Sequence, residues 1–178
     1  MRHYKSLWDL KTGRKPPFEG NIYTAAGQAL EQVILDAIQA EYGLKMEDVD
    51  SAVHPDVDFL FASPDAIGTD RTGRRSIIEA KAPQTEKSRA KWGAPHEGWP
   101  AVPVNYRPQI VCQMAVWGLD HALVGAHLGA PEIAVYSLYR ELDWEDELIE
   151  RCGDFWQHVT RNEAPRKIQI PRNQWWTA

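Results

Sequence analysis

A stripe of apolar residues at three- and four-residue spacing runs through positions 24–43 and consists of Leu30, Ile34, Leu35 and Ile38. This spacing predicts an amphipathic helix that begins near Thr24, a candidate cap, and ends near Gly43. Glu31 falls on the same stripe, because the residues three, four and seven positions further on are apolar. We therefore expect the Glu31 carboxylate to point toward the apolar side of the helix rather than toward water.

Two later segments have the composition of β-strands: VDFLFASPD at 57–65 and RRSIIEAKAP at 74–83. The turn-rich stretch GTDRTGRR separates them, so we expect an antiparallel hairpin or two neighbours in one sheet. Alternation along the second strand places Ile77, Glu79 and Lys81 on one face. The other face then carries Ser76, Ile78 and Ala80.

The same two periodicities predict the remaining elements. Residues 105–118 and 144–159 have helical spacing, and 121–129 and 132–142 have strand composition. Residues 92–103 are rich in Gly, Pro and Trp, which predicts a surface loop, and residues 1–23 predict an irregular arm. The order of elements predicts an α/β (α+β) fold, with a central mixed β-sheet flanked by helices.

The length of 178 residues is typical of one domain, so we expect a single domain with an arm at 1–23, a core at 24–160 and an extension at 161–178. No stretch reaches the roughly 20 apolar residues of a membrane span, and the N-terminus lacks the apolar core of a signal peptide. These features predict a cytoplasmic protein without a membrane partner. Cys112 and Cys152 lack CxxC spacing and lie in apolar-periodic segments, which predicts buried thiols rather than a disulfide framework or a metal cluster.

The net charge of −5 conceals a segregated pattern. Seven basic and three acidic residues lie between positions 70 and 91, whereas positions 141–154 hold seven acids and Arg151 as the one base. The basic segment surrounds Glu79 and Lys81 in sequence, which makes it a candidate surface for a polyanion. The acidic segment is typical of a solvated helix face.

Asp65, Glu79 and Lys81 carry the sharpest chemical signal. Two carboxylates brought together from neighbouring strands repel each other, so such a site needs a cation, and oxygen ligands favour Mg²⁺ or Mn²⁺ over zinc. The Ala80 carbonyl is a further candidate ligand. Glu31 is another, because a carboxylate on an apolar helix face is costly unless it is paired, protonated or bound to metal.

This arrangement suits the hydrolysis of a phosphodiester. Lys81 either orients and helps to deprotonate the attacking water or offsets negative charge in the transition state, and the sequence does not separate these roles.

Four sequence blocks follow one another along the chain: GlnAlaLeuGlu at 28–31, SerProAspAla at 63–66, IleIleGluAlaLys at 77–81 and ValProValAsnTyrArgProGln at 102–109. Together they resemble the phage-type recombination exonucleases, the YqaJ-like and lambda-exonuclease group of the PD-(D/E)XK nuclease superfamily. The resemblance implies a Mg²⁺-dependent exonuclease that degrades one strand of duplex DNA from its 5′ end and leaves a 3′ single strand for annealing or recombination.

The resemblance also implies a role for individual residues. Asp65 and Glu79 would hold the metal, Lys81 would act on the nucleophilic water, and Glu31 would complete the acidic cluster. Tyr106 and Gln109 match the family's Tyr-x-x-Gln helix, in which the glutamine reaches the active site. The family often has Gly after the aspartate and Cys after the lysine, where this chain has Ala66 and Ala82; neither change removes a catalytic group.

The expected DNA contacts are spread over several segments and comprise Tyr106, Gln113, Arg74, Arg75, Lys87 and Arg14. Trp92 and Trp99 pack in the interior or loop, stack on a splayed base, or close over the site as a mobile loop. The expected partners are duplex DNA ends and, from the family, a single-strand annealing protein. The sequence leaves open whether the protein forms a homo-oligomer. Trp175 and Trp176 would serve either as part of its interface or as a buried anchor of the C-terminus.

Two other functions stay open. One is a structure-specific or restriction-type endonuclease of the same superfamily, because the metal site is shared and substrate geometry resides in loops. The other is a non-catalytic module that binds DNA ends.

Overall fold

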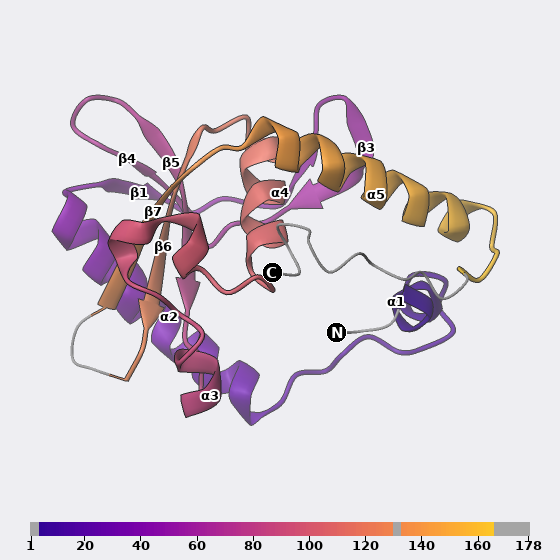
Figure 1. Cartoon of the computed structure of the whole chain (residues 1–178), viewed down its shortest axis with the longest axis horizontal. Coiled ribbons are helices and arrows are strands. Elements are labelled where there is room, and N and C mark those ends of the chain that lie inside the picture. The colour runs from indigo at the N-terminus through magenta and orange to yellow at the C-terminus, as the bar shows by residue number, and fades with distance from the viewer. Residues whose placement is uncertain (1–3, 130–132, 166–178) are drawn as a thin grey trace.

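The computed structural model describes residues 4–129 and 133–165, and it is built on a five-stranded β-sheet (Figure 1). In spatial order the strands are β1 (Lys45–Glu47), β4 (Ala66–Thr69), β5 (Arg75–Lys81), β6 (His121–His127) and β7 (Ile133–Tyr139). β5 and β6 run parallel, and the other neighbouring pairs are antiparallel. The predicted fold class, a mixed sheet flanked by helices, is confirmed.

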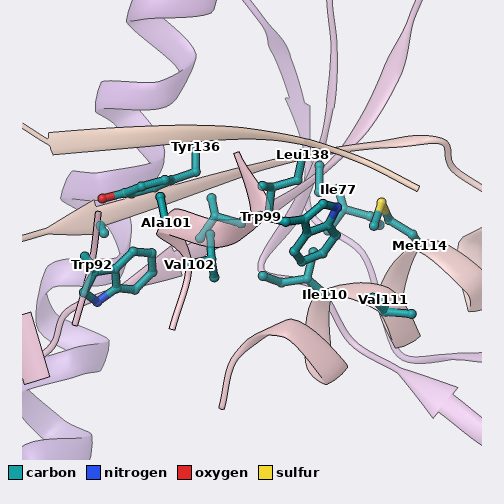
Figure 2. Packing of buried hydrophobic residues seen from close by; sticks show 13 residues of the cluster. Ile77, Trp92, Trp99, Ala101, Val102, Ile110, Val111, Met114, Tyr136 and Leu138 are labelled. Carbon is teal, nitrogen blue, oxygen red and sulfur yellow. The ribbon is translucent and has the colours of Figure 1, made fainter. Parts of the chain in front are cut away.

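Helices cover both faces of the sheet. α2 (Ile22–Tyr42) packs on one face, where it shares a buried cluster with Ile78 of β5 and Leu123 of β6. α4 (Arg107–Trp117) packs on the other face, against a cluster that includes Ile77 and Val124 (Figure 2). Because neighbouring residues of β5 belong to opposite clusters, the predicted alternation of its side chains is confirmed.

α2 has a defined cap at each end. The Asn21 side chain accepts hydrogen bonds from the backbone N–H groups of Tyr23 and Thr24, and the Thr24 hydroxyl accepts one from the Asn21 N–H. This reciprocal arrangement is a capping box. At the other end Gly43 has a φ of 61°, a left-handed conformation that glycine adopts without strain. The predicted helix is confirmed, although it begins at Ile22 rather than at Thr24.

The predicted pairing of segments 57–65 and 74–83 is wrong. β3 (Val57–Ala62) pairs with β2 (Ala52–His54) in a separate two-stranded sheet, and the antiparallel partner of β5 is β4. Pro64, which has no backbone N–H to donate, separates β3 from β4. Asp70 then closes the β4–β5 hairpin, because its side chain accepts hydrogen bonds from the backbone N–H groups of Thr72 and Arg74.

The N-terminal arm contains a helix that its composition did not predict. α1 (Tyr4–Lys11) is too short to be stable in isolation, and it packs on α5 (Leu142–Thr160) (Figure 1). The indole Nε1 of Trp8 donates a hydrogen bond of 3.0 Å to the carbonyl of His158. The prediction of an irregular arm is therefore wrong for residues 4–11, since a contact 150 positions away stabilises the helix.

Residues 92–103 lie partly at the surface as predicted, with 95–97 exposed, but other parts of the segment enter the interior. They contain two 3-10 turns, at Pro95–Glu97 and Trp99–Ala101, and Trp92 and Trp99 are both buried. The Trp99 indole donates a hydrogen bond of 2.8 Å to the carbonyl of Tyr139. Large aromatic rings gain most from burial, which draws this segment into the interior. Of the roles considered for the tryptophans, interior packing is confirmed.

The other predicted elements are present as α4, β6, β7 and α5, and the structure adds β1, β2 and the one-turn helix α3 (Glu86–Arg89). Cys112 and Cys152 are free thiols in one apolar cluster, and burial raises the pKa of Cys112 to about 12. Within the described residues, no helix combines the length and apolarity that crossing a bilayer requires. Trp175 and Trp176 lie outside the described residues.

Candidate active site

Asp65 approaches β5 where the pairing of β4 with β5 stops. The last paired residues are Ala66 and Ile78, so the end of β5 has no β4 partner beyond Ile78. Asp65 takes over at this point, because its Oδ2 accepts a hydrogen bond of 2.7 Å from the Ala80 N–H. The carboxylate of Asp65 therefore lies against the strand end that carries Glu79.

Glu79 is a carboxylate with three hydrogen-bond donors and an exposed fraction of 1%. Lys81 Nζ and Gln109 Nε2 donate to its Oε1, the second over 2.6 Å, and Gln113 Nε2 donates to its Oε2 over 2.6 Å. Lys81 comes from the same face of β5, and the two glutamines lie four residues apart on one side of α4. A buried carboxylate is costly unless it is paired and hydrogen-bonded, and these donors satisfy both oxygens.

A cavity of ≈ 390 Å³ opens beside these groups, between α2, the end of β5 and the start of α4. The residues predicted to carry the chemistry are all in its lining: Glu31, Asp65, Glu79, Ala80, Lys81, Tyr106 and Gln109. Lys81 Nζ lies 5.5 Å from the centre of the Tyr106 ring, so the amine is placed between a carboxylate and an aromatic wall. The structure thus gathers these residues from four separate parts of the chain.

Glu31 reaches the cavity because α2 packs unusually close to the sheet. Gly125 of β6 is paired in register with Ala80, and a Cβ atom there would lie 2.6 Å from Ile34 and 2.7 Å from Ile38. α2 can lie at this depth only over a glycine. Glu31 precedes Ile34 by about one turn, and its half-buried side chain faces the cavity, as the apolar stripe predicts.

The acidic groups of the cavity affect one another. Burial raises the pKa of Glu31, the charge of Asp65 raises it further, and Lys81 opposes the rise. Burial also raises the pKa of Glu79, against the lowering effect of Lys81 and with a further rise from Asp65. Carboxylates that disfavour one another's ionisation in this way favour a cationic ligand between them.

Residues 1–120 match the model of the YqaJ-like viral recombinase domain family. The chain belongs to this family. The matched segment contains every residue that lines the cavity and ends just before β6. The family expected from the four sequence blocks is therefore confirmed. No curated protein matches the chain.

Solved structures of exonucleases share the fold of this YqaJ-like domain. LHK-Exo in complex with dAMP matches with a TM-score of 0.69 at 20% identity, over 89% of this chain and 79% of that one. The alkaline exonuclease LHK-Exo from Laribacter hongkongensis matches with a TM-score of 0.66 at 18% identity and the same coverage. A phage-related exonuclease from Haemophilus somnus 129PT matches with a TM-score of 0.62 at 16% identity, over 89% and 81% of the two chains. These similarities establish the fold.

The YqaJ-like cavity differs in one respect from the predicted acidic cluster. Within residues 4–129 and 133–165, no three His, Cys, Asp or Glu side chains lie close enough together to form a metal-binding group. The carboxylates line one cavity without converging on one point, because Glu79 turns to Lys81 and the α4 amides while Asp65 turns to the Ala80 N–H. The donor set consists of carboxylate and carbonyl oxygens, which fits a hard divalent cation such as Mg²⁺ or Mn²⁺.

The basic residues expected to contact DNA are not gathered at the cavity. Arg74 precedes β5 and Arg75 begins it, at a distance of about 20 Å from Lys81 for a rise of about 3.3 Å per residue. Both form ion pairs there, with Asp70 and Glu47 respectively. The basic segment therefore does not surround the site as its sequence suggested, because the β4–β5 hairpin directs its first half to the opposite end of the strand.

Two other basic residues have different surroundings. Arg14 donates a hydrogen bond of 2.8 Å to Asn162 and lies 4.1 Å from the Trp8 ring, at the contact between the arm and the end of α5. Lys87 is exposed on α3, which follows β5 at the cavity end of that strand. Of the basic residues expected to contact DNA, Lys87 is thus the one at the cavity end of β5.

Gln113 is not placed to contact DNA, which corrects the sequence prediction. It is 1% exposed, and besides its bond to Glu79 it donates one of 3.4 Å to the carbonyl of Ser63. The sequence signal for the contact of Gln113 with Glu79 is its four-residue spacing from Gln109, beside the apolar Ile110 and Met114 that mark the buried side of α4. Gly125, whose bare Cα lets α2 approach, carried no signal in the sequence.

Proposed function

We propose that this protein is a divalent-metal-dependent exonuclease that hydrolyses one strand of duplex DNA from its 5′ end and leaves a 3′ single strand for recombination. The observation that carries the proposal is the contact of Lys81 with Glu79 beside Asp65 in one cavity. Membership of the YqaJ-like family and a fold shared with alkaline and phage-related exonucleases support it. The dAMP bound by LHK-Exo supports a nucleotide as the released product.

The residues of the cavity have complementary roles in this reaction. Asp65, Glu79 and Glu31 would hold Mg²⁺ or Mn²⁺ together with the Ala80 carbonyl. The bound cation would supply Lewis-acid stabilisation of the phosphate oxygens and a more acidic water. Lys81 Nζ would orient the attacking water or offset charge on the phosphate, and Gln109 would fix the Oε1 side of Glu79.

DNA would be held mainly through its phosphates. Tyr106 in the cavity wall and the exposed Lys87 are the nearest candidates for contact, whereas Arg14, Arg74 and Arg75 have other surroundings. Because phosphate contacts release counterions, we expect binding that weakens steeply with salt and shows little sequence preference. A protein that anneals the exposed 3′ strand is the partner that this reaction implies.

End-labelled duplex DNA tests the function and its polarity. With Mg²⁺, a linear duplex should release its 5′ label as mononucleotide and keep its 3′ label on a strand that becomes single. EDTA should prevent both the release of the 5′ label and the formation of single strand. Closed circular DNA should survive. Cutting of the circle would indicate an endonuclease, early release of the 3′ label would reverse the polarity, and binding without cleavage would indicate a DNA-end-binding module. Substrates with 5′-phosphate and 5′-hydroxyl ends show which terminus is required.

Asp65→Asn tests the metal site in the same assay. Even outer-shell partners of a metal contribute about 10- to 100-fold, so the loss of a direct ligand should slow cleavage at least about 100-fold. Asp58→Asn is the matched control, because Asp58 is exposed on β3 and does not line the cavity. Cleavage by Asp65→Asn at the same rate as by Asp58→Asn would show that Asp65 is not a metal ligand.

A further inference from the structure

The two oxygens of Glu79 depend on different donors. Oε1 accepts hydrogen bonds from both Lys81 and Gln109, whereas Oε2 accepts one from Gln113, its one donor among the described residues. Glu79 is 1% exposed, so bulk water does not replace a lost donor. The orientation of the Oε2 side of this carboxylate therefore depends on Gln113.

Gln113 occupies this position at a cost to stability. Its side chain is 1% exposed, and its Oε1 is buried without a hydrogen-bond partner in the part of the chain that the structure describes. An apolar side chain would avoid this cost, because an unpaired buried polar atom is destabilising. The neighbours Met114 and Ala115 show that α4 otherwise fills its buried positions with apolar residues. The amide is thus better explained by what it holds than by packing alone.

The hydrogen bonds of Gln113 complete a network that links the segments carrying both carboxylates. Its Nε2 donates to Glu79 and, over 3.4 Å, to the carbonyl of Ser63, two residues before Asp65. Asp65 in turn accepts the hydrogen bond of the Ala80 N–H, the residue after Glu79. One amide from α4 therefore connects the strand that carries Glu79 with the bend that carries Asp65.

We propose that Gln113 is a positioning residue that sets the affinity of the cavity for a divalent cation. It does so by holding the Glu79 carboxylate in a fixed position relative to the Ser63–Asp65 bend. This inference rests on the proposed function, because it takes Asp65 and Glu79 as cation ligands. Gln113 does not touch the substrate. Gln109 differs from it, because Gln109 is exposed at the cavity and shares Oε1 with Lys81.

Gln113→Met tests the inference, because methionine keeps the volume and apolar packing of the side chain and removes both donors. The measurement is Mn²⁺ binding at equilibrium, with free Mn²⁺ followed by electron paramagnetic resonance in the absence of DNA. We expect the dissociation constant to rise at least about tenfold, as for other outer-shell partners of a metal. Gln157→Met is the matched control, because Gln157 is exposed on α5, and it should bind Mn²⁺ like the wild type.

The dependence of cleavage on Mg²⁺ separates positioning from a general structural role. For Gln113→Met we expect a higher half-saturating Mg²⁺ concentration and a maximal rate that largely recovers at high Mg²⁺. A purely structural role would lower the rate equally at every Mg²⁺ concentration and leave Mn²⁺ binding within about twofold of the wild type, which would overturn the inference. Absence of Mn²⁺ binding by the wild type would instead overturn the metal site and this inference together.

A measurement on the wild type keeps the inference testable if Gln113→Met does not fold. The side-chain amide protons of Gln113 should exchange slowly with solvent and shift when Mg²⁺ is added, as followed by nuclear magnetic resonance. Those of Gln157 should exchange quickly and stay in place. A Gln113 resonance that does not respond to Mg²⁺ would overturn the coupling between this amide and the cation.

Discussion

Glu79 shows how the chain keeps a charged group in its interior. Folding removes this carboxylate from water and supplies three hydrogen-bond donors in its place. Of the three, the Lys81 ammonium carries a full charge. A buried carboxylate without a partner is strongly destabilising, so Lys81 serves the folded state as well as the proposed chemistry. Lys81 thus has a structural contact as well as its proposed catalytic role.

His121 is a second buried polar group, and its partners are neutral. Its ring lies between Ser76 and Ser137, with Nδ1 2.7 Å and Nε2 2.8 Å from their hydroxyl oxygens, and it is 3% exposed. Burial, with a smaller effect of Arg74, lowers its pKa to about 4 from an ordinary value of 6.5, against an opposing effect of Asp70. The folded state therefore holds this histidine neutral at pH values where the unfolded chain protonates it.

This difference predicts a loss of stability in acid. The contribution of neutral His121 is fully present above pH 6.5 and is lost as the pH falls toward 4, with a total of about 3 kcal/mol in the free energy of unfolding. Urea unfolding at several pH values measures it, and His121→Gln is the reference because carboxylates also titrate in this range. The stability difference between the two proteins should shrink as the pH falls. A difference that stays constant from pH 7 to pH 4 would contradict the neutral assignment.

At the level of elements, the end of β4 creates the site. Where β4 stops pairing, Asp65 takes its place against β5, and α2 and α4 approach this strand end from opposite faces of the sheet. α2 brings Glu31, and α4 brings both glutamines. The approach of α2 depends on one position in β6, Gly125, where any side chain would meet buried isoleucines.

Gly125→Ala should therefore both destabilise the fold and slow the reaction. The new methyl group would meet Ile34 and Ile38 and force α2 away from the sheet, at a cost of about 1 to 3 kcal/mol. Gly153→Ala on α5 is the matched control: its Cβ would meet Phe59 at 3.4 Å, and alanine should stabilise the helix by about 0.5 to 1 kcal/mol. Denaturant unfolding gives the change in the free energy of unfolding for both substitutions. A Gly125→Ala protein as stable as the wild type would contradict the close packing of α2.

The sequence predicted the parts of the site that depend on local geometry. Glu79 and Lys81 share a face because side chains two apart on a strand must do so, and the apolar stripe of α2 placed Glu31 correctly. The pairing of β5 was missed, because the Pro64 break makes β4 a strand of four residues with little pattern of its own. The four-residue spacing from Gln109 placed Gln113 on the side of α4 that faces the site, but its burial against Glu79 depends on the packing of α4 on β5. The position of Arg74 and Arg75 depends in turn on the hairpin that was missed.

At the level of the whole molecule, the two ends of the described chain pack against each other. α1 packs on α5 away from the sheet, as Figure 1 shows, and the Trp8 indole, the Arg14–Asn162 hydrogen bond and the contact of Tyr4 with Phe155 make the connection. None of these residues lines the cavity. We therefore expect this contact to support the stability of the chain rather than its chemistry.

Trp8→Ala tests that expectation. The loss of a buried indole and its hydrogen bond to His158 should lower the free energy of unfolding by about 3 to 5 kcal/mol, in a single transition with the rest of the chain. Lys5→Ala on the same helix should cost less than about 1 kcal/mol, because its ion pair with Asp9 is largely exposed on the lysine side. A separate early transition, or a loss as small as that of Lys5→Ala, would show that the arm is not part of the cooperative unit.

The amine of Lys81 tests the central claim most directly. The measurement is the single-turnover rate of cleavage of a 5′-labelled duplex at saturating enzyme and Mg²⁺, for Lys81→Ala and for Lys45→Ala, an exposed lysine on β1, each beside the dissociation constant for the same duplex. We predict a rate at least about 100-fold below the wild type for Lys81→Ala, with duplex binding within about threefold, and a wild-type rate for Lys45→Ala. Cleavage by Lys81→Ala at the wild-type rate would contradict the account.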